Sequence, residues 1–301
     1  MLRKPEKLKQ GDKIGIFVPA SPVRDSFRQK GMAKLEQLGY EPVEVDRILA
    51  RQEFIAKPVE ESLDDIQHLL NRIDVRALWA ARGGYGSNYL LPHLKKLEIE
   101  KPKIVIGSSD VSYLLWYMLE HFHMVVFYGP MVFSALAENR VNLGQLQAVL
   151  SGTEPEMKIE GRVLIPGRAR GVLTGGCLSN LVSLIGTPFF PEIRQRILLL
   201  EDVNERPYRL DRMLWQLDQI GVFQKIRGLV LGEFPDCFKD DREKEGFFSR
   251  LGDYLSGIRI PVLVDLPLGH SDSVHTIPLG IEVEMDTSDR SGLILRENAV
   301  E

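Results

Sequence analysis

The chain has 301 residues, of which 44% are hydrophobic and 27% charged, with a formal net charge of −4. This length can bury a full core and, at roughly 150 residues per domain, favours two domains. The negative charge argues against a nucleic-acid partner, because proteins that neutralise phosphates carry a basic excess.

Three absences narrow the cellular setting. Cys177 and Cys237 form no CxxC pair, which favours a reduced, cytoplasmic protein. Residues 1–13 lack an apolar segment, so we expect no secretory signal. The longest uncharged stretch, 124–137, is shorter than the ~18 residues of a membrane span and is broken by a glycine and a proline, so we expect no membrane segment.

The first half of the chain alternates short apolar runs with segments of helical period. We expect strands near 14–18, 43–45, 77–80, 104–106 and 125–128, and helices that end near Gly39, cover 63–73, begin near Ser87 and run from about 111 to 121. Apolar strands that alternate with helices predict a parallel sheet covered on both faces.

The middle of the chain, 138–170, is polar and has no long apolar period. We expect it to link an N-terminal α/β domain, residues 1–137, to a C-terminal α/β domain, residues 171–301. In the second half, the pattern predicts a turn at Gly175-Gly176, a helix near Ser179, strands at 197–200 and 229–231, and a helix over 208–220.

Three loops of the first half are candidate binding sites, because ligands in open α/β sheets sit beyond the carboxyl ends of the strands. They cover residues 19–22, 82–86 and 107–110. The glycines of the second loop, Arg82-Gly83-Gly84-Tyr85-Gly86, would let a substrate approach the backbone closely. A plain strand-to-helix turn remains an equal alternative, and a phosphate cradle is weaker because RGGYG matches neither GxGxxG nor a Walker loop.

Ser109 lies in the third loop, at a tight turn between a predicted strand and a predicted helix. That context is typical of a nucleophile elbow, although the sequence is not GxSxG. A helix N-cap is the alternative role and a common one for serine. Ser108 is the neighbour that could be confused with it.

A serine nucleophile needs a base, and six histidines are available. His270 follows a glycine in a loop after the apolar run 262–264, a better position for chemistry than that of the helical His68 or His93. His121 and His123 have no carboxylate at metal-site spacing, so we expect no metal.

The base in turn needs an orienting carboxylate. Glu201 and Asp202 directly follow the predicted strand 197–200, where an acid is well placed for a site. The alternative is structural: Asp202 or Glu205 would cap the next helix or pair with one of the arginines that follow.

Seven blocks between residues 11 and 280 occur in an order and spacing that resemble the serine L,D-carboxypeptidases, a family that includes muramoyl-tetrapeptide carboxypeptidases and microcin-C self-immunity peptidases. The blocks are GDKIGIFVPASPV, ARGGYGSNYLLPHL, KIVIGSSDVS, FYGPM, GGCLSNLVSLIGTPFF, ILLLEDVNERPYRLDRMLWQL and PLGHSDSVHTIPLG. The resemblance implies an N-terminal parallel-sheet domain of flavodoxin or Rossmann-like type, a C-terminal α/β swivelling domain, and an active site at the domain interface. It also implies a homodimer.

The resemblance selects a Ser-Glu-His triad of Ser109, Glu201 and His270, the last in preference to His275. Such sites are defined by geometry, so the order along the chain is compatible with a triad. The resemblance also implies an oxyanion hole from the backbone N–H groups of Gly84 or Tyr85 and of Asp110. Arg82 is a candidate for holding the terminal carboxylate of the substrate, because a guanidinium can grip it with two parallel bonds.

The resemblance implies cleavage of the bond between an L-diamino acid and terminal D-Ala in a murein tetrapeptide, with no cofactor. Two departures bear on specificity: Ser108 replaces the family's usual aromatic residue and Cys177 its usual Asn. One alternative is a microcin-immunity amidase that cleaves peptidyl or aminoacyl nucleotides. It ranks lower because Trp79, Trp116 and Trp215 fit core or helix-face positions better than a surface for a nucleotide base. A non-catalytic cleft-binding protein is the third hypothesis.

Overall fold

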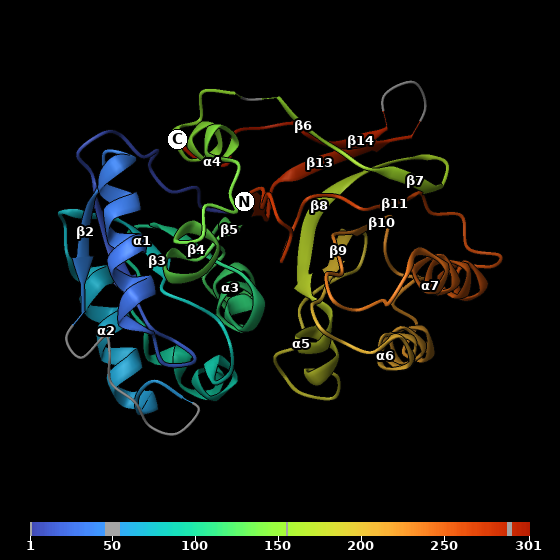
Figure 1. Cartoon of the computed structure of the whole chain (residues 1–301), viewed down its shortest axis with the longest axis horizontal. Helices are drawn as coiled ribbons and strands as arrows, with labels where there is room; N and C mark the ends of the chain where they lie inside the picture. The colour runs from blue at the N-terminus through green and yellow to red at the C-terminus, as the bar shows by residue number, and fades with distance from the viewer. Residues whose placement is uncertain (1, 46–54, 155, 288–290) are drawn as a thin grey trace. The chain divides into compact units, whose positions relative to one another are not determined.

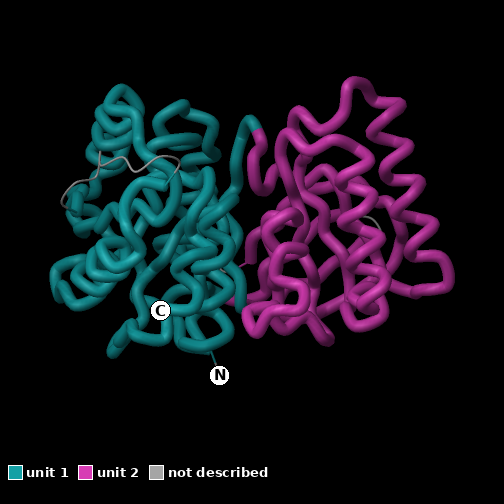
Figure 2. The backbone as a smooth tube through the Cα atoms, turned by 90° about the horizontal axis from the view of Figure 1, so that it is seen from below, with its two compact units in different colours: residues 1–154, 272–280, 298–301 teal, residues 155–271, 281–297 magenta. Residues whose placement is uncertain are grey.

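The computed structural model describes residues 2–45, 55–154, 156–287 and 291–301. They form two compact units, coloured separately in Figure 2. Unit 1 comprises residues 1–154, 272–280 and 298–301, and unit 2 comprises residues 155–271 and 281–297. Both units are therefore discontinuous in sequence, unlike the continuous domains 1–137 and 171–301 that the sequence pattern predicts.

Unit 1 is built on a mostly parallel sheet. Its strands are β1 (Lys13–Phe17), β2 (Glu41–Glu44), β3 (Val75–Ala80), β4 (Ile104–Gly107), β5 (Val126–Tyr128) and β12 (Ile277–Leu279). Their order is β12-β5-β4-β3-β1-β2, with β1 to β5 parallel and β12 antiparallel to β5. This is the flavodoxin-like order, whose ligand site lies at the switch point between β1 and β3. The predicted parallel sheet is confirmed.

Helical segments cover both faces of this sheet (Figure 1). They are α1 (Asp25–Gln37), α2 (Val59–Asn71), η1 (Ser87–Lys96), η2 (Ser109–Val111), α3 (Ser112–His121), η3 (Val132–Leu136) and α4 (Leu143–Ser151). α2 and α3 both contact η1, whereas α1 contacts η3. The chain moves along the sheet in one direction from β1 to β2 and in the opposite direction in the later steps from β2 to β5. Because the crossovers are right-handed, α1 lies on one face of the sheet, and α2, η1 and α3 lie on the other. The helix predicted from Ser87 is a 3-10 helix, and it contains Pro92, which has no N–H for an α-helical bond.

Unit 2 contains a larger mixed sheet. Its strands are β6 (Met157–Glu160), β7 (Arg162–Ile165), β8 (Arg168–Cys177), β9 (Ile197–Glu201), β10 (Gly228–Leu231), β11 (Val262–Val264), β13 (Glu282–Asp286) and β14 (Gly292–Leu295), and its helices are α5 (Leu178–Ser183), α6 (Pro207–Gln219) and α7 (Asp241–Tyr254). The order is β6-β14-β13-β8-β9-β10-β11-β7, with β8 to β11 parallel and the outer strands antiparallel. The segment 138–170, predicted to be a link, carries α4, β6, β7 and the start of β8.

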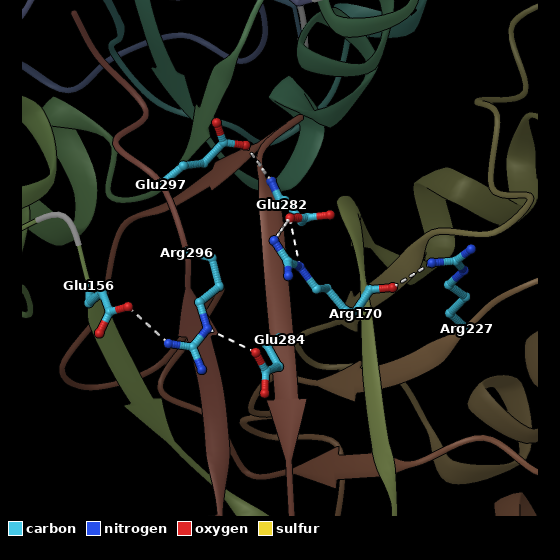
Figure 3. Close-up of polar contacts among 7 residues, drawn as sticks. All are labelled: Glu156, Arg170, Arg227, Glu282, Glu284, Arg296 and Glu297. Atoms are coloured by element: carbon cyan, nitrogen blue, oxygen red, sulfur yellow. Dashed lines mark hydrogen bonds and ion pairs between the residues drawn. The ribbon is translucent and has the colours of Figure 1, made fainter.

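Strand β13 shows how the antiparallel part of this sheet divides its faces. Val283 is fully buried, whereas the acids beside it point outward and bind arginines of neighbouring segments (Figure 3). Arg170 Nε donates to Glu282 over 2.7 Å, and Arg296 Nε donates to Glu284 over 2.9 Å. Exposed pairs of this kind contribute only about 0–1 kcal/mol each, so buried apolar residues rather than the ion pairs hold the strand.

One extended segment borders both edges of the unit 2 sheet. β6 pairs with β14 at one edge and β7 pairs with β11 at the other, yet only Gly161 separates the two strands. A Cβ atom at Gly161 would lie 2.5 Å from Leu266 Cδ1 and 3.1 Å from the carbonyl oxygen of Val264. The crossing from edge to edge therefore needs a residue without a side chain.

We predict that Gly161→Ala lowers the free energy of unfolding by about 1–3 kcal/mol, the usual cost of forcing a methyl group into packed space. The matched control is Gly246→Ala in α7, where a Cβ would meet nothing within 4 Å. That change should raise stability by up to about 1 kcal/mol, because alanine favours a helix over glycine. Urea unfolding of both variants measures the difference, and equal effects would contradict the packing argument.

Candidate active site

The three candidate loops of unit 1 are tied together at the carboxyl edge of its sheet. Ser21 N–H donates to the carbonyl of Gly83 over 3.3 Å, and Ser21 Oγ accepts from the N–H of Tyr85 over 3.0 Å. The carboxylate of Asp110 accepts from the N–H of Ser87 over 2.8 Å. The loops 19–22, 82–86 and 107–110 thus form one cross-linked group, as the parallel sheet predicts.

Ser109 occupies a strained turn between β4 and α3. Its φ is 56°, in the left-handed region that non-glycine residues seldom adopt. Its N–H donates to Tyr128 Oη over 3.1 Å, which holds the turn from the end of β5. Ser108 occupies the N-cap position of η2 but makes no side-chain capping hydrogen bond, and Ser109 is the first residue of η2. A strained strand-turn-helix is the geometry of a nucleophile elbow.

Gly83 packs directly against this serine. A Cβ atom at Gly83 would lie 3.1 Å from Ser109 Cβ and 3.2 Å from Ser109 Oγ. The glycine loop therefore brings its backbone next to the hydroxyl. The N–H of Tyr85, one of the donors predicted for an oxyanion, is donated to Ser21 Oγ.

Two charged side chains, those of Asp110 and Arg82, lie in the loops at this edge of the sheet. Burial raises the pKa of the Asp110 carboxyl, and the hydrogen bonds from Ser87 partly oppose that rise. Burial lowers the pKa of Arg82, and the neighbouring Arg24 lowers it further. The Arg82 guanidinium donates to the carbonyl of Pro22 over 3.0 Å. Two cations close together make a positive region beside the glycine loop.

Glu201 and His270 form a hydrogen-bonded pair in unit 2. Glu201 is the last residue of β9 and is fully buried, and its Oε2 lies 2.7 Å from His270 Nδ1. The His270 side chain is 22% exposed. With Nδ1–H donated to the carboxylate, Nε2 carries a lone pair and can accept a proton. The pair has the arrangement of a base and its orienting acid.

Gly269 makes room for this pair. Its φ is +89°, and a Cβ atom there would lie 2.2 Å from Glu201 Oε2. Glycine is the residue that accepts both the left-handed backbone and the close carboxylate. The Gly-His order in the sequence therefore has a local physical reason.

Asp202, the other acid predicted at this strand end, has a structural role. Its carboxylate accepts from the N–H groups of Ser179, over 2.8 Å, and Val203, over 2.9 Å. Burial, followed by the charge of Glu201, raises the pKa of Asp202 to about 6. Glu205, the remaining alternative, forms an ion pair with Arg209 at 3.5 Å.

The other groups considered from the sequence are His275, which makes contacts with other residues, and the two cysteines, which are buried. His275 Nε2 lies 3.1 Å from Asn142 Nδ2, and its Nδ1 lies 3.1 Å from the carbonyl of Ser273. Burial raises the pKa of both thiols, that of Cys237 to about 11, which disfavours thiolate chemistry. No group of three or more His, Cys, Asp or Glu residues in the described ranges is placed to hold a metal ion. Across the same ranges, no helix is long and apolar enough to cross a membrane.

The sequence places Ser21 and Gly83 in candidate loops and Tyr128 in a predicted strand, but it does not give the roles of these three residues. Ser21 orders the glycine loop, Tyr128 holds the Ser109 turn, and Gly83 packs against the Ser109 hydroxyl. All three lie in the sequence blocks that resemble the serine L,D-carboxypeptidases, and this resemblance is the signal in the sequence that could have found them. Their roles depend on contacts between strands that are distant in sequence.

The raised pKa of Asp202 predicts a pH-dependent stability. The unfolded chain releases this proton near pH 3.8 and the folded chain near pH 6. Stability from this group is therefore full below pH 3.8 and declines as pH rises towards 6, by up to about 3 kcal/mol at 1.36 kcal/mol per pKa unit. In Asp202→Asn this decline should be absent.

Chemical denaturation of both proteins between pH 4 and 7 tests this prediction. The difference in unfolding free energy between variant and wild type should change across that window. The control is Asp241→Asn, at an exposed position. Parallel curves for wild type and Asp202→Asn would show that Asp202 does not titrate as stated.

Comparisons with known proteins agree over most of the chain. The model of the LD-carboxypeptidase N-terminal domain matches residues 14–129, and that of the LD-carboxypeptidase C-terminal domain matches residues 170–285. A probable murein peptide carboxypeptidase of Bacillus subtilis is 31% identical over 97% of this chain and 94% of its own length.

Solved structures share the fold. A muramoyltetrapeptide carboxypeptidase from Oxalobacter formigenes superposes with a TM-score of 0.81 at 31% identity, over 94% of this chain and 97% of that one. MccF in complex with glutamyl sulfamoyl guanosine gives a TM-score of 0.89 over 99% of both chains, but at 23% identity this likeness shows the fold alone. The chain therefore belongs to the LD-carboxypeptidase family and is a serine-type carboxypeptidase, a hydrolase.

Proposed function

We propose that this enzyme is an L,D-carboxypeptidase that releases terminal D-Ala from murein tetrapeptides during cytoplasmic cell-wall recycling. The 2.7 Å bond between His270 and the buried Glu201 carries the proposal, because it supplies an oriented base in a family of known reaction type. The names of the Bacillus subtilis and Oxalobacter formigenes relatives support a murein peptide as the substrate.

In the proposed mechanism, Ser109 Oγ attacks the carbonyl of the diamino acid while His270 Nε2 takes the hydroxyl proton. Glu201 holds the imidazole and stabilises its charged form. His270 then protonates the departing amine of D-Ala, and water hydrolyses the acyl-enzyme by the same proton route. Ser109 belongs to unit 1, and Glu201 and His270 belong to unit 2.

The remaining groups would bind the substrate. The N–H groups of Gly84 and Asp110 are the proposed oxyanion donors, and one such donor is typically worth about 10²–10³ in rate. Arg82, in the positive region that it shares with Arg24, is the proposed contact for the terminal carboxylate. We also propose a homodimer, as the family resemblance implies, which light scattering of the purified protein would measure.

Substitution of the nucleophile tests the reaction. Ser109→Ala should lower kcat for D-Ala release from a tetrapeptide by at least about 10⁴-fold, and Glu201→Gln by about 10⁴-fold. Ser108→Ala is the matched control and should keep most of the activity. Mass spectrometry detects the product, and circular dichroism checks that each variant is folded. An active Ser109→Ala together with an inactive Ser108→Ala would refute the assignment.

The same assay should include an aminoacyl-sulfamoyl adenylate, the substrate type of the microcin-immunity alternative. We expect release of D-Ala from the tetrapeptide and little cleavage of the nucleotide. The reverse result would favour the alternative function. Failure to cleave either substrate, with no labelling of Ser109 by a fluorophosphonate, would favour a non-catalytic binding protein.

Because Gly83 packs closely against Ser109, we predict that one methyl group added at Gly83 lowers the activity. Gly83→Ala should lower kcat/KM by about 10²-fold, because small displacements of reacting groups are costly. Gly144→Ala, in α4 of the same unit, is the control, since its nearest neighbour would lie 3.8 Å away. Normal activity of Gly83→Ala would mean that the loop does not constrain Ser109.

A further inference from the structure

A pocket in unit 1 lies between α1 and the segment that follows η3. Its volume is about 550 Å³, which is within the roughly 300–1,000 Å³ of small-molecule sites in proteins. One wall is the segment 136–139. The other wall is formed by four residues of α1, which are Lys30, Ala33, Lys34 and Gln37. We call this cavity the α1 pocket.

The wall formed by α1 carries two positive charges that the helix does not neutralise. Lys30 and Lys34 are four residues apart, so they lie on one face of α1, and Gln37 follows on the same face. No acid stands three or four residues from either lysine. Within the described parts of the chain, none of these three side chains makes a hydrogen bond or an ion pair. Like charges at this spacing disfavour a helix, and a bound anion would relieve their repulsion.

The opposite wall adds apolar surface and an amide. Leu136 and Ala137 are buried. Glu138 carries the one acid among the described lining residues, and its Oε2 accepts from Arg140 Nε over 2.9 Å and Nη2 over 2.6 Å. An arginine outside the lining therefore compensates this carboxylate, and the pocket keeps its two positive charges. The side-chain amide of Asn139 makes no hydrogen bond within the described ranges.

The chemistry of this lining favours a phosphate ester over a carboxylate. An ammonium group binds phosphate as a compact point charge, whereas a carboxylate is best gripped by the planar fork of arginine. No arginine is among the described residues that line the pocket. A phosphate monoester carries up to two negative charges near neutral pH, which matches two ammonium groups. The apolar residues and the amides of Gln37 and Asn139 suit an organic group attached to the phosphate.

We propose that the α1 pocket binds a small phosphate monoester, with Lys30 and Lys34 at the phosphate and the organic group against Ala33 and Leu136. No described lining residue belongs to the loops that carry Ser109 and the glycines beside it. Binding at the α1 pocket therefore does not depend on the proposed peptidase reaction.

Titration with two probes, followed by the line width of the phosphorus NMR signal, tests the proposal. Wild type should bind phenyl phosphate saturably with a Kd below about 1 mM, and inorganic phosphate at least about 3-fold more weakly. Lys30→Gln/Lys34→Gln should weaken both about 10-fold or more, because hydrogen bonds from charged groups are the stronger ones. Binding of phenyl phosphate should also weaken below about pH 6, where the phosphate loses its second charge.

Two further variants separate the pocket from general electrostatic attraction. Lys95→Gln/Lys96→Gln removes the same charge from two exposed lysines of η1 in the same unit, and it should change neither affinity. Ala33→Trp narrows the pocket without changing its charge, so it should weaken binding of phenyl phosphate and leave that of inorganic phosphate nearly unchanged. Circular dichroism checks that each variant is folded.

Four results would overturn the proposal. They are no saturable binding of either probe, equal affinity for the two probes, equal losses in the two double-lysine variants, and loss of binding in Arg82→Ala but not in Lys30→Gln/Lys34→Gln. Equal affinities would leave an inorganic anion as the ligand. The last result would place the anion in the positive region beside the glycine loop. Each of these results can be obtained whether or not the enzyme releases D-Ala.

Discussion

A fully buried carboxylate is the constraint on which the candidate site in unit 2 depends. Removing Glu201 from water costs several kcal/mol unless the charge is paired and hydrogen-bonded. His270 Nδ1–H supplies a hydrogen bond to the carboxylate, and Gly269 leaves the space that the carboxylate needs. The loop after β11 is thereby tied to the end of β9. The interaction that makes the charge tolerable also fixes the tautomer and direction of the imidazole.

Unit 1 holds a serine, Ser109, in an unfavourable backbone conformation. A left-handed residue costs about 1–3 kcal/mol and persists only where its surroundings determine it. Around Ser109 these surroundings are the Tyr128 hydroxyl on one side and Gly83 on the other. Asp110 links the same turn to η1. The strained turn, the close contact with Gly83 and the link through Asp110 are therefore parts of one local structure.

Several parallel strands could be predicted from the sequence because they are short apolar runs, as at 104–106 and 197–200. The prediction was wrong at β8, because its glycines suggested a turn at Gly175-Gly176, yet both residues lie inside the strand and pair with β9. The pairing of the antiparallel strands was harder to predict, since β13 pairs with β8, more than a hundred residues earlier. α7 is highly charged and has no strong apolar stripe in its sequence. Ser109, Glu201 and His270 were selected by family resemblance, because no local pattern shows that residues 201 and 270 meet.

The discontinuity of the two units has a consequence for how the gene can evolve. Residues 272–280 leave unit 2 to add β12 beside β5, the strand that carries Tyr128. A fragment that ended at residue 154 would encode the Ser109 turn but leave the edge of β5 without its neighbour, and unpaired edges favour aggregation. A single recombination event between relatives therefore cannot exchange one unit intact. Substrate preference is expected to diversify through substitutions within loops rather than through exchange of whole units.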